Sequence, residues 1–241
     1  MPTDREVPSA DLGSVRVLLF LLSVIAGTTD VIGFLGLNGL FTAHITGNLV
    51  LLCTHLAGTG DIQTSAILSI PVFAAVVCLT RILAGRLILK HTGPLCLLLF
   101  LQFACLAGFL CICTLAGQHP PVDAPITVLA GMLGVSAMAV QNALAQIAIE
   151  NAPSTAIMTS NVTRFAVDVG TIILGAEKTY VDKARLRSNR TLPVIVGFAL
   201  GCGIGAVCEQ NVGLTALALP TTLAAIALAL GIAIERGIER S

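Results

Sequence analysis

The side chains best placed to do chemistry are polar residues that lie inside apolar stretches of the chain. Asp30 lies within a nearly continuous apolar run, and the tripeptide of Thr46, Gly47 and Asn48 follows shortly afterwards. A charged carboxylate at the centre of a bilayer costs at least about 2.5–3.5 kcal/mol, so it faces a cavity or a partner. Asp30 is therefore expected to bind a cation, a proton or a hydrogen-bonding solute. The alternative is a structural pairing, either with the N–H groups of a chain turn or with Arg164.

The tripeptide is suited to a chain turn inside the membrane. Gly47 accepts backbone angles that other residues avoid, while Thr46 and Asn48 can hydrogen-bond the backbone groups that a turn leaves free. The alternative is that these small and hydroxyl side chains only let membrane helices approach closely. The same two interpretations apply to a second cluster, which consists of Thr159, Ser160 and Asn161.

Four further polar residues are candidates for a substrate or ion pathway or for its support. Gln141 and Asn142 either hydrogen-bond a neighbouring helix or line the pathway. Arg164 and Asp168 are four residues apart, which is the spacing of an ion pair on one helix face. We therefore expect these two side chains to neutralise each other.

No catalytic constellation is visible in the sequence. It contains no nucleophile elbow, no zinc-protease motif and no nucleotide-binding loop. The eight cysteines lie in apolar runs without a C-x-x-C pair, and neither His44 nor His55 has a second ligand at metal spacing. The segment from Gly201 to Gly205 contains a G-x-x-x-G step, which indicates close helix packing. We expect no enzyme activity, no metal and no cofactor, and the zero net charge gives no reason to expect nucleic-acid binding.

The elements that must position these residues are membrane helices. The 241 residues are 56% hydrophobic and only 11% charged, whereas soluble domains carry roughly 25% charged residues. Eight apolar segments can be drawn, at 15–37, 39–57, 63–84, 94–117, 124–149, 152–175, 191–210 and 212–235. They predict one transmembrane domain over 15–235, between polar tails at 1–14 and 236–241.

The chain also repeats itself weakly. The stretch TAHITGN at 42–48 aligns without a gap with TAIMTSN at 155–161, and polar residues interrupt the segment before each stretch. The first four segments then match the last four in order, which gives two halves at about 15–117 and 124–235. Duplicated halves of this kind are common in transporters.

The distribution of lysine and arginine predicts how many segments cross. If all eight crossed, basic loops would lie on both sides of the membrane, against the positive-inside bias. If segments 39–57 and 152–175 are re-entrant or broken, the basic residues share one side. The prediction is an all-α polytopic protein with six full crossings and two inverted halves. It would lie in the inner cell membrane with both termini in the cytoplasm.

The first polar region resembles the bacterial YoaK-like family of integral membrane proteins. The matching residues are Gly27, Asp30, Gly33, Phe34, Gly39, Leu40, Phe41, Thr42, Ala43, Thr46, Gly47 and Asn48. The second-half run Gln141-Asn142-Ala143, with Thr155 and Thr159, is similar to that family too, although Ser160 stands where a glycine is expected. The resemblance implies a polytopic inner-membrane protein and carries no biochemical activity with it.

Polar clusters at matching positions of two inverted halves favour a secondary transporter or channel for a small solute. The candidate pathway residues are Asp30, Thr46, Gly47, Asn48, Gln141, Asn142, Thr159, Ser160, Asn161 and Arg164. The alternative is a non-transporting scaffold or partner subunit, whose polar residues only pack helices. The expected partners are the lipid bilayer and a solute, and the sequence leaves open whether the protein is a homo-oligomer.

Overall fold

The computed structural model describes residues 9–58, 63–89, 93–117, 121, 123–149, 152–156, 158–175 and 177–240. Within these ranges the regular structure is helical and contains no strand, which confirms the predicted all-α class. Residues 1–8 of the predicted N-terminal tail, Lys90 and Ser241 lie outside the described residues.

Each of the eight apolar segments contains an α-helix. The helices are α1 (Ser9–Gly36), α2 (Ile45–Leu56), α3 (Thr64–Leu89), α4 (Leu95–Ala116), α5 (Pro125–Ile147), α6 (Met158–Ile173), α7 (Lys178–Val212) and α8 (Ala218–Arg240). A 3₁₀ turn, η1 (Gly213–Leu217), joins the last two. Helix α7 begins 13 residues before its predicted apolar segment, because the basic run is rich in good helix formers such as lysine, arginine and alanine. Helices α1 and α8 likewise extend into the residues predicted as tails.

In the part of the chain that the structure describes, five helical segments are long and apolar enough to cross a membrane, by length and composition. They are Gly13–Gly36, Thr64–Leu89, Leu95–Ala116, Pro125–Ile147 and Lys178–Gly237, and the last includes α7, η1 and most of α8. By contrast, α2 has 12 residues and α6 has 16. These two helices are about 18 Å and 24 Å long, which is shorter than the hydrocarbon core of about 30 Å.

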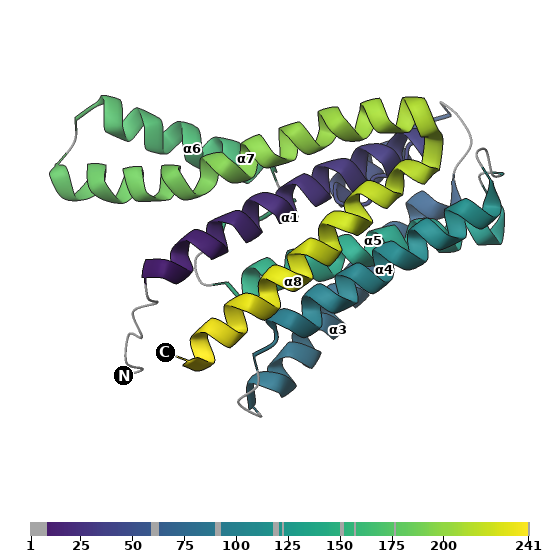
Figure 1. Ribbon diagram of the computed structural model, residues 1–241. Helices are drawn as coiled ribbons and strands as arrows, with labels where there is room; N and C mark the ends of the chain where they lie inside the picture. Colours follow the sequence, from purple (N-terminus) through teal and green to yellow (C-terminus); the bar gives the residue numbers. More distant parts are fainter. Residues whose placement is uncertain are drawn as a thin grey trace.

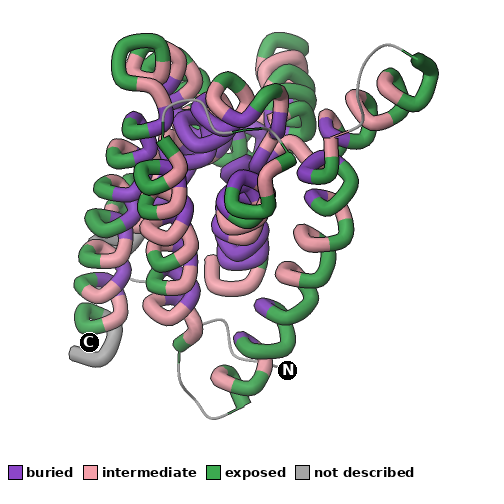
Figure 2. Tube along the Cα trace, turned by 90° about the vertical axis from the view of Figure 1, so that its right-hand side faces the viewer, coloured by how far each residue is buried: buried purple, intermediate pink, exposed green. Residues whose placement is uncertain are grey.

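The long helices form a bundle in which α1 and α5 are the most buried (Figure 1). Helix α1 packs against α7 and α8, and α5 packs against α3 and α4. Each short helix packs against the long helix that follows it, so α2 lies on α3 and α6 lies on α7. Buried positions line the inside of the bundle, while exposed positions lie on its outside (Figure 2).

Glycines allow α1 and α7 to touch at their backbones. A Cβ on Gly201 would lie 2.4 Å from the carbonyl oxygen of Val24, and one on Gly205 would lie 3.0 Å from the Cα of Thr28. From the α1 side, a Cβ on Gly27 would lie 2.3 Å from the carbonyl oxygen of Phe198. The expected close packing at the G-x-x-x-G step is therefore confirmed.

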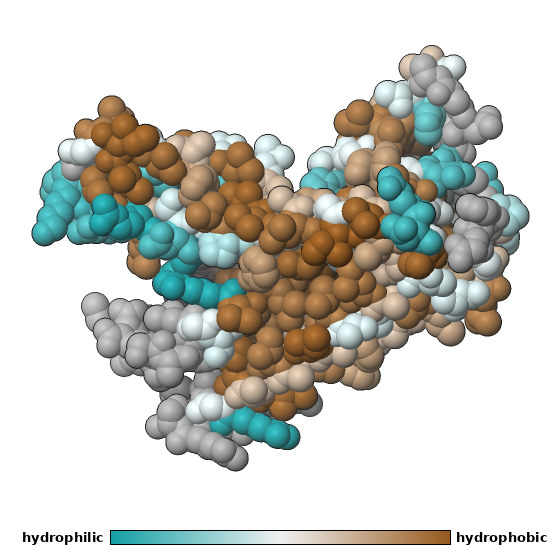
Figure 3. All heavy atoms as spheres, turned by 45° about the horizontal axis from the view of Figure 1, so that its top comes forward, coloured by the Kyte–Doolittle hydropathy of each residue, from teal (hydrophilic) through white to brown (hydrophobic). Residues whose placement is uncertain are grey.

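The outer surface carries many apolar side chains. Leu79, Leu89, Leu115 and Ile173 are each more than 60% exposed. Figure 3 shows apolar side chains over the middle of one face and hydrophilic side chains toward its two ends. Soluble monomers rarely expose apolar patches of this extent, so the surface is suited to contact with lipid.

Candidate functional site

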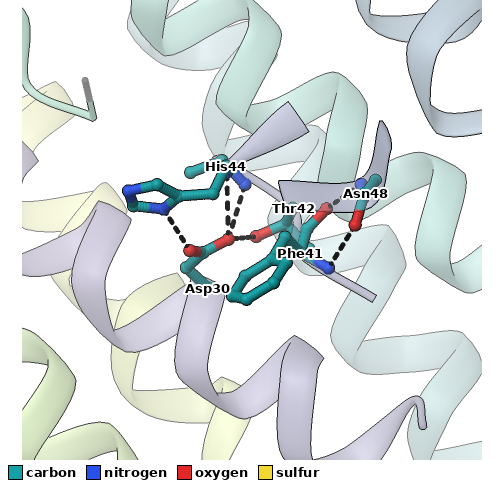
Figure 4. Close-up of polar contacts among 6 residues, drawn as sticks. Asp30, Phe41, Thr42, His44 and Asn48 are labelled. Atoms are coloured by element: carbon teal, nitrogen blue, oxygen red, sulfur yellow. Dashed lines mark hydrogen bonds and ion pairs between the residues drawn. The ribbon is translucent and has the colours of Figure 1, made fainter. Parts of the chain in front are cut away.

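Asp30 anchors the loop that returns from the end of α1 to the start of α2. Its side chain is only 4% exposed. Oδ1 accepts a hydrogen bond from the Ala43 N–H at 2.7 Å, with the Thr42 hydroxyl at 3.3 Å and the His44 N–H at 3.4 Å (Figure 4). Oδ2 lies 2.6 Å from Nδ1 of His44. Of the pairings that the sequence left open, the structure therefore has the one with the N–H groups of a turn, and not the one with Arg164.

His44 is a partner of Asp30 that sequence reasoning missed. Its side chain is 34% exposed, and its ring lies edge-on to Phe198 of α7 and to Phe41, with centroid distances of 5.4 and 6.0 Å. The two residues are 14 positions apart, which is no standard helix or strand spacing. Only the returning loop brings them together. A carboxylate and an imidazole at hydrogen-bonding distance can hold and exchange a proton.

Asn48 ties the same loop to two helices. Its side-chain amide is fully buried and makes two hydrogen bonds to the backbone of Phe41, where it donates to the carbonyl at 2.7 Å and accepts from the N–H at 2.9 Å. It also donates to the hydroxyl of Ser69 on α3 at 2.9 Å. The ring of Phe41 covers Gly47, where a Cβ would lie 2.8 Å from a ring carbon. Thr46, by contrast, is exposed.

The second cluster makes a related turn before α6. Asn161 donates to the carbonyl of Ser154 at 2.6 Å, which is the same seven-residue reach that joins Asn48 to Phe41. The hydroxyl of Ser154 donates to Oδ1 of Asn142 at 3.3 Å. This second turn is thus held to α5, as the first is held to α1.

Gln141 is the centre of a buried polar network. Its side-chain nitrogen donates to the carbonyl of Leu22 on α1 at 2.9 Å and to the hydroxyl of Thr155 at 2.8 Å. Its side-chain oxygen accepts from Gln102 of α4 at 2.7 Å. Gln102 was not expected from the sequence, although a glutamine inside an apolar helix could have signalled it. Its own Oε1 is buried and has no hydrogen-bond partner within the described part of the chain.

A cleft of about 640 Å³ lies between α6 and α7. Six of its seven lining residues carry polar or charged groups, and the full set is Thr159, Ser160, Thr163, Arg164, Val167, Asp168 and Arg187. Three predicted pathway residues, Thr159, Ser160 and Arg164, therefore lie together here, and the contacts of Asp30 lie elsewhere.

The predicted ion pair between Arg164 and Asp168 is replaced in the structure. Asp168 is 1% exposed, and it pairs with Arg187 of α7, whose Nη2 lies 2.5 Å and whose Nε lies 3.2 Å from Oδ1. The guanidinium reaches the carboxylate with two nitrogens across the helix interface, a stronger geometry than a single contact along one helix. Arg164 is left exposed in the cleft.

The comparisons with known proteins agree with this membrane architecture. The model of the family described as "Protein of unknown function (DUF1275)" matches residues 18–230. A stretch of 63 residues is 43% identical to the UPF0700 transmembrane protein YoaK of Bacillus subtilis (strain 168), and it covers 26% of this chain and 27% of that protein. No solved structure matches the chain. The chain therefore belongs to the DUF1275 family, as the YoaK-like resemblance predicted, and it is a membrane protein with several apolar helices.

Proposed function

We propose that the protein is a secondary transporter or channel that moves a small solute across the inner cell membrane. The observation that carries the proposal is the pair of short helices, α2 and α6, each preceded by a turn with buried polar contacts. Irregular backbone at membrane depth is tolerated where it is buried in protein or lines a water-filled cavity. Transporters use such broken segments to form their solute sites.

The proposed topology has six crossings and two re-entrant segments. Helices α7 and α8 run in opposite directions on either side of η1 (Figure 1), so their shared apolar segment supplies two crossings. Helices α2 and α6 are shorter than the membrane is thick. The segment that contains each of them therefore enters and leaves the membrane on the same side. The starts of α1 and α7 and the ends of α3 and α8 then share the cytoplasmic side, and these parts carry Arg16, Arg81, Arg86, Lys178, Lys183, Arg185, Arg187, Arg190 and Arg236.

The two halves are proposed to be inverted repeats. Helix α6 begins 113 residues after α2, and α7 begins 114 residues after α3. In Figure 1, α1 and α5 run in opposite directions, as do α3 and α7. The helix contacts follow the same relation. Helix α1 of the first half packs on α7 of the second, and the corresponding α5 of the second half packs on α3 of the first. Such a relation would bring the two turns together, and Ala43 and Ala156 belong to one buried cluster.

The α6–α7 cleft is proposed as the cytoplasmic entrance. Asp168 pairs with Arg187, and the two helices run antiparallel, so the start of α6 lies toward Phe198 of α7. The ring of Phe198 contacts His44. A polar route would then run from the cleft toward the Asp30–His44 pair.

Thiol labelling tests the entrance. Ser160 lines the cleft. Val162 lies on the same helix and is also exposed, but it is not part of the cleft lining, so a cysteine is introduced at each position in turn. We expect a membrane-impermeant thiol reagent to modify Ser160→Cys in reconstituted protein and to leave Val162→Cys unmodified, because lipid covers the latter. The measurement is the increase in protein mass after labelling, compared with the increase for the protein that lacks the introduced cysteine. Equal labelling of the two variants would contradict a water-filled cleft bordered by lipid.

A transport measurement then tests the function itself. Concentration jumps of a panel of small solutes are applied to proteoliposomes on a solid-supported membrane. We expect a current or flux that is lost when Ser160→Cys is modified and retained when Val162→Cys is treated in the same way. Flux that is unaffected by modification in the cleft would refute the entrance.

The competing proposal is a non-transporting scaffold or partner subunit. It is favoured by the carboxylate of Asp30, which is occupied by contacts to Thr42, Ala43 and His44 within its own chain. Under this proposal, Ser160→Cys would label without any solute flux, and co-purification of a partner subunit would depend on the exposed helix faces.

A further inference from the structure

The α6–α7 cleft contains an arginine, Arg164, that pairs with no carboxylate of the described residues. Arg164 and Arg187 contribute two positive charges, and Asp168 contributes one negative charge that already pairs with Arg187. Among the described residues, Arg164 has no ion pair. An arginine at membrane depth faces water or an anion, because exposure to acyl chains is costly. We propose that the cleft binds an oxyanion, a phosphate or carboxylate group, with Arg164 as its charged anchor. This inference rests on the proposed function and names the class of its solute.

Hydroxyl donors surround Arg164 on the same face of α6. Thr159, Ser160 and Thr163 line the cleft with it. Ser160 lies four residues before Arg164, and Thr159 lies four residues before Thr163, so the four side chains form two adjacent rows along α6. A guanidinium with nearby hydroxyls is a common donor set for phosphate and carboxylate oxygens. The volume of about 640 Å³ lies within the range of small-molecule sites.

The start of α6 adds to the positive potential. Helix α6 has 16 residues and no acidic residue in its first turn, and the free N–H groups of a helix start attract anions. The start of α2 differs, because Asp30 accepts hydrogen bonds from the N–H groups just before that helix. The turn before α6 contacts Gln141 and Asn142 instead, and both are uncharged. Within the described residues, no carboxylate therefore accepts a hydrogen bond from the turn before α6.

The first half also indicates that the turn itself does not require Ser160, Thr163 or Arg164, although Thr159 corresponds to Thr46. At the positions 113 residues earlier, Ser160, Thr163 and Arg164 correspond to Gly47, Val50 and Leu51. The first half makes its turn with apolar or small residues there, and the Asn48 contact to Phe41 is preserved as Asn161 to Ser154. Ser160, Thr163 and Arg164 are therefore additional to the structural requirement, which favours a binding role for them.

A charge-selective labelling experiment tests the site. Val167→Cys is the reporter, because Val167 lines the cleft and is 61% exposed but supplies no donor. In reconstituted protein, we expect an anionic thiosulfonate reagent to modify this cysteine on the order of tenfold faster than a cationic one of similar size. Inorganic phosphate and succinate are expected to slow the anionic reagent.

The Arg164→Gln variant identifies the anchor. It should remove both the preference for the anionic reagent and the protection by phosphate. The matched control is Arg185→Gln, which removes an exposed arginine of α7 that does not line the cleft, and it should leave both effects in place. Size-exclusion chromatography checks that each variant is folded.

Two lipid mixtures distinguish the source of the oxyanion. In phosphatidylcholine vesicles, protection by added phosphate or succinate indicates a soluble anion. Protection that requires phosphatidylglycerol instead indicates a lipid headgroup, and either result supports the site if it depends on Arg164. The proposal is overturned if labelling shows no charge preference, or if Arg185→Gln acts like Arg164→Gln. If the cysteine is labelled readily but without a preference for the anionic reagent, the oxyanion site is refuted while the cleft remains a candidate solute entrance. Failure of the oxyanion site can therefore be distinguished from failure of the proposed function.

Discussion

Gly201→Val is expected to prevent α1 and α7 from packing and to abolish the yield of folded protein. A Cβ at this position would lie 2.4 Å from the carbonyl oxygen of Val24 and 3.1 Å from the backbone nitrogen of Thr28. Both atoms belong to the α1 backbone, so no side chain can rotate away to relieve the clash. Overpacking of a core costs about 1–3 kcal/mol when side chains can adjust, and the cost here exceeds that range. The measurement is the monodisperse fraction after detergent extraction and its thermal unfolding.

Gly203→Val is the matched control for this substitution. Gly203 lies on the same helix, and a Cβ there would have nothing within 4 Å. Both variants make the same change in helix propensity and hydrophobicity, so only the contact with α1 differs. If the two variants unfolded at the same temperature, the close α1–α7 contact would be wrong. The position of Phe198 next to His44 would then be in doubt as well.

Asp30→Ala is expected to destabilise the protein by about 3 kcal/mol, because it leaves buried donors of the returning loop unpaired. The N–H groups of Ala43 and His44 and the hydroxyl of Thr42 all lose their acceptor. For a protein of this size, that loss lowers the melting temperature by roughly 6–12 °C. Thermal unfolding in detergent measures it directly.

Two further variants separate the contacts of Asp30 from its charge. Asp30→Asn keeps an acceptor oxygen for the Ala43 N–H, so its melting temperature should lie between those of Asp30→Ala and the wild type. Asp182→Ala removes an exposed carboxylate of α7 and should have no effect. A melting temperature of Asp30→Ala equal to that of the wild type would contradict the anchoring role. Because Asp30→Asn is expected to preserve most of the fold, loss of flux in that variant would assign Asp30 a direct part in the proposed transport.

The helices and the class of the protein could be predicted from the sequence, because they depend on local composition. A helix in lipid satisfies its own backbone hydrogen bonds, so a run of apolar residues is enough to specify it. All eight apolar segments contain a helix, and the largest boundary difference is at α7, where polar helix formers extend the helix beyond the apolar run. The alignment of 42–48 with 155–161 predicted related turns, and the contacts of Asn48 and Asn161 are indeed related.

The partners of the polar residues were decided only by the tertiary structure. Spacing predicted that Asp168 would pair with Arg164 on its own helix, but α7 places Arg187 against it with better geometry. Asp30 meets His44, and Gln141 meets Gln102 and Leu22, because a returning loop and neighbouring helices bring distant residues within hydrogen-bonding distance. The local sequence pattern determines which polar residues need a hydrogen-bond or ion-pair partner inside a membrane. Which donor or acceptor satisfies each one depends on how the helices pack, and helix packing is not encoded in sequence spacing.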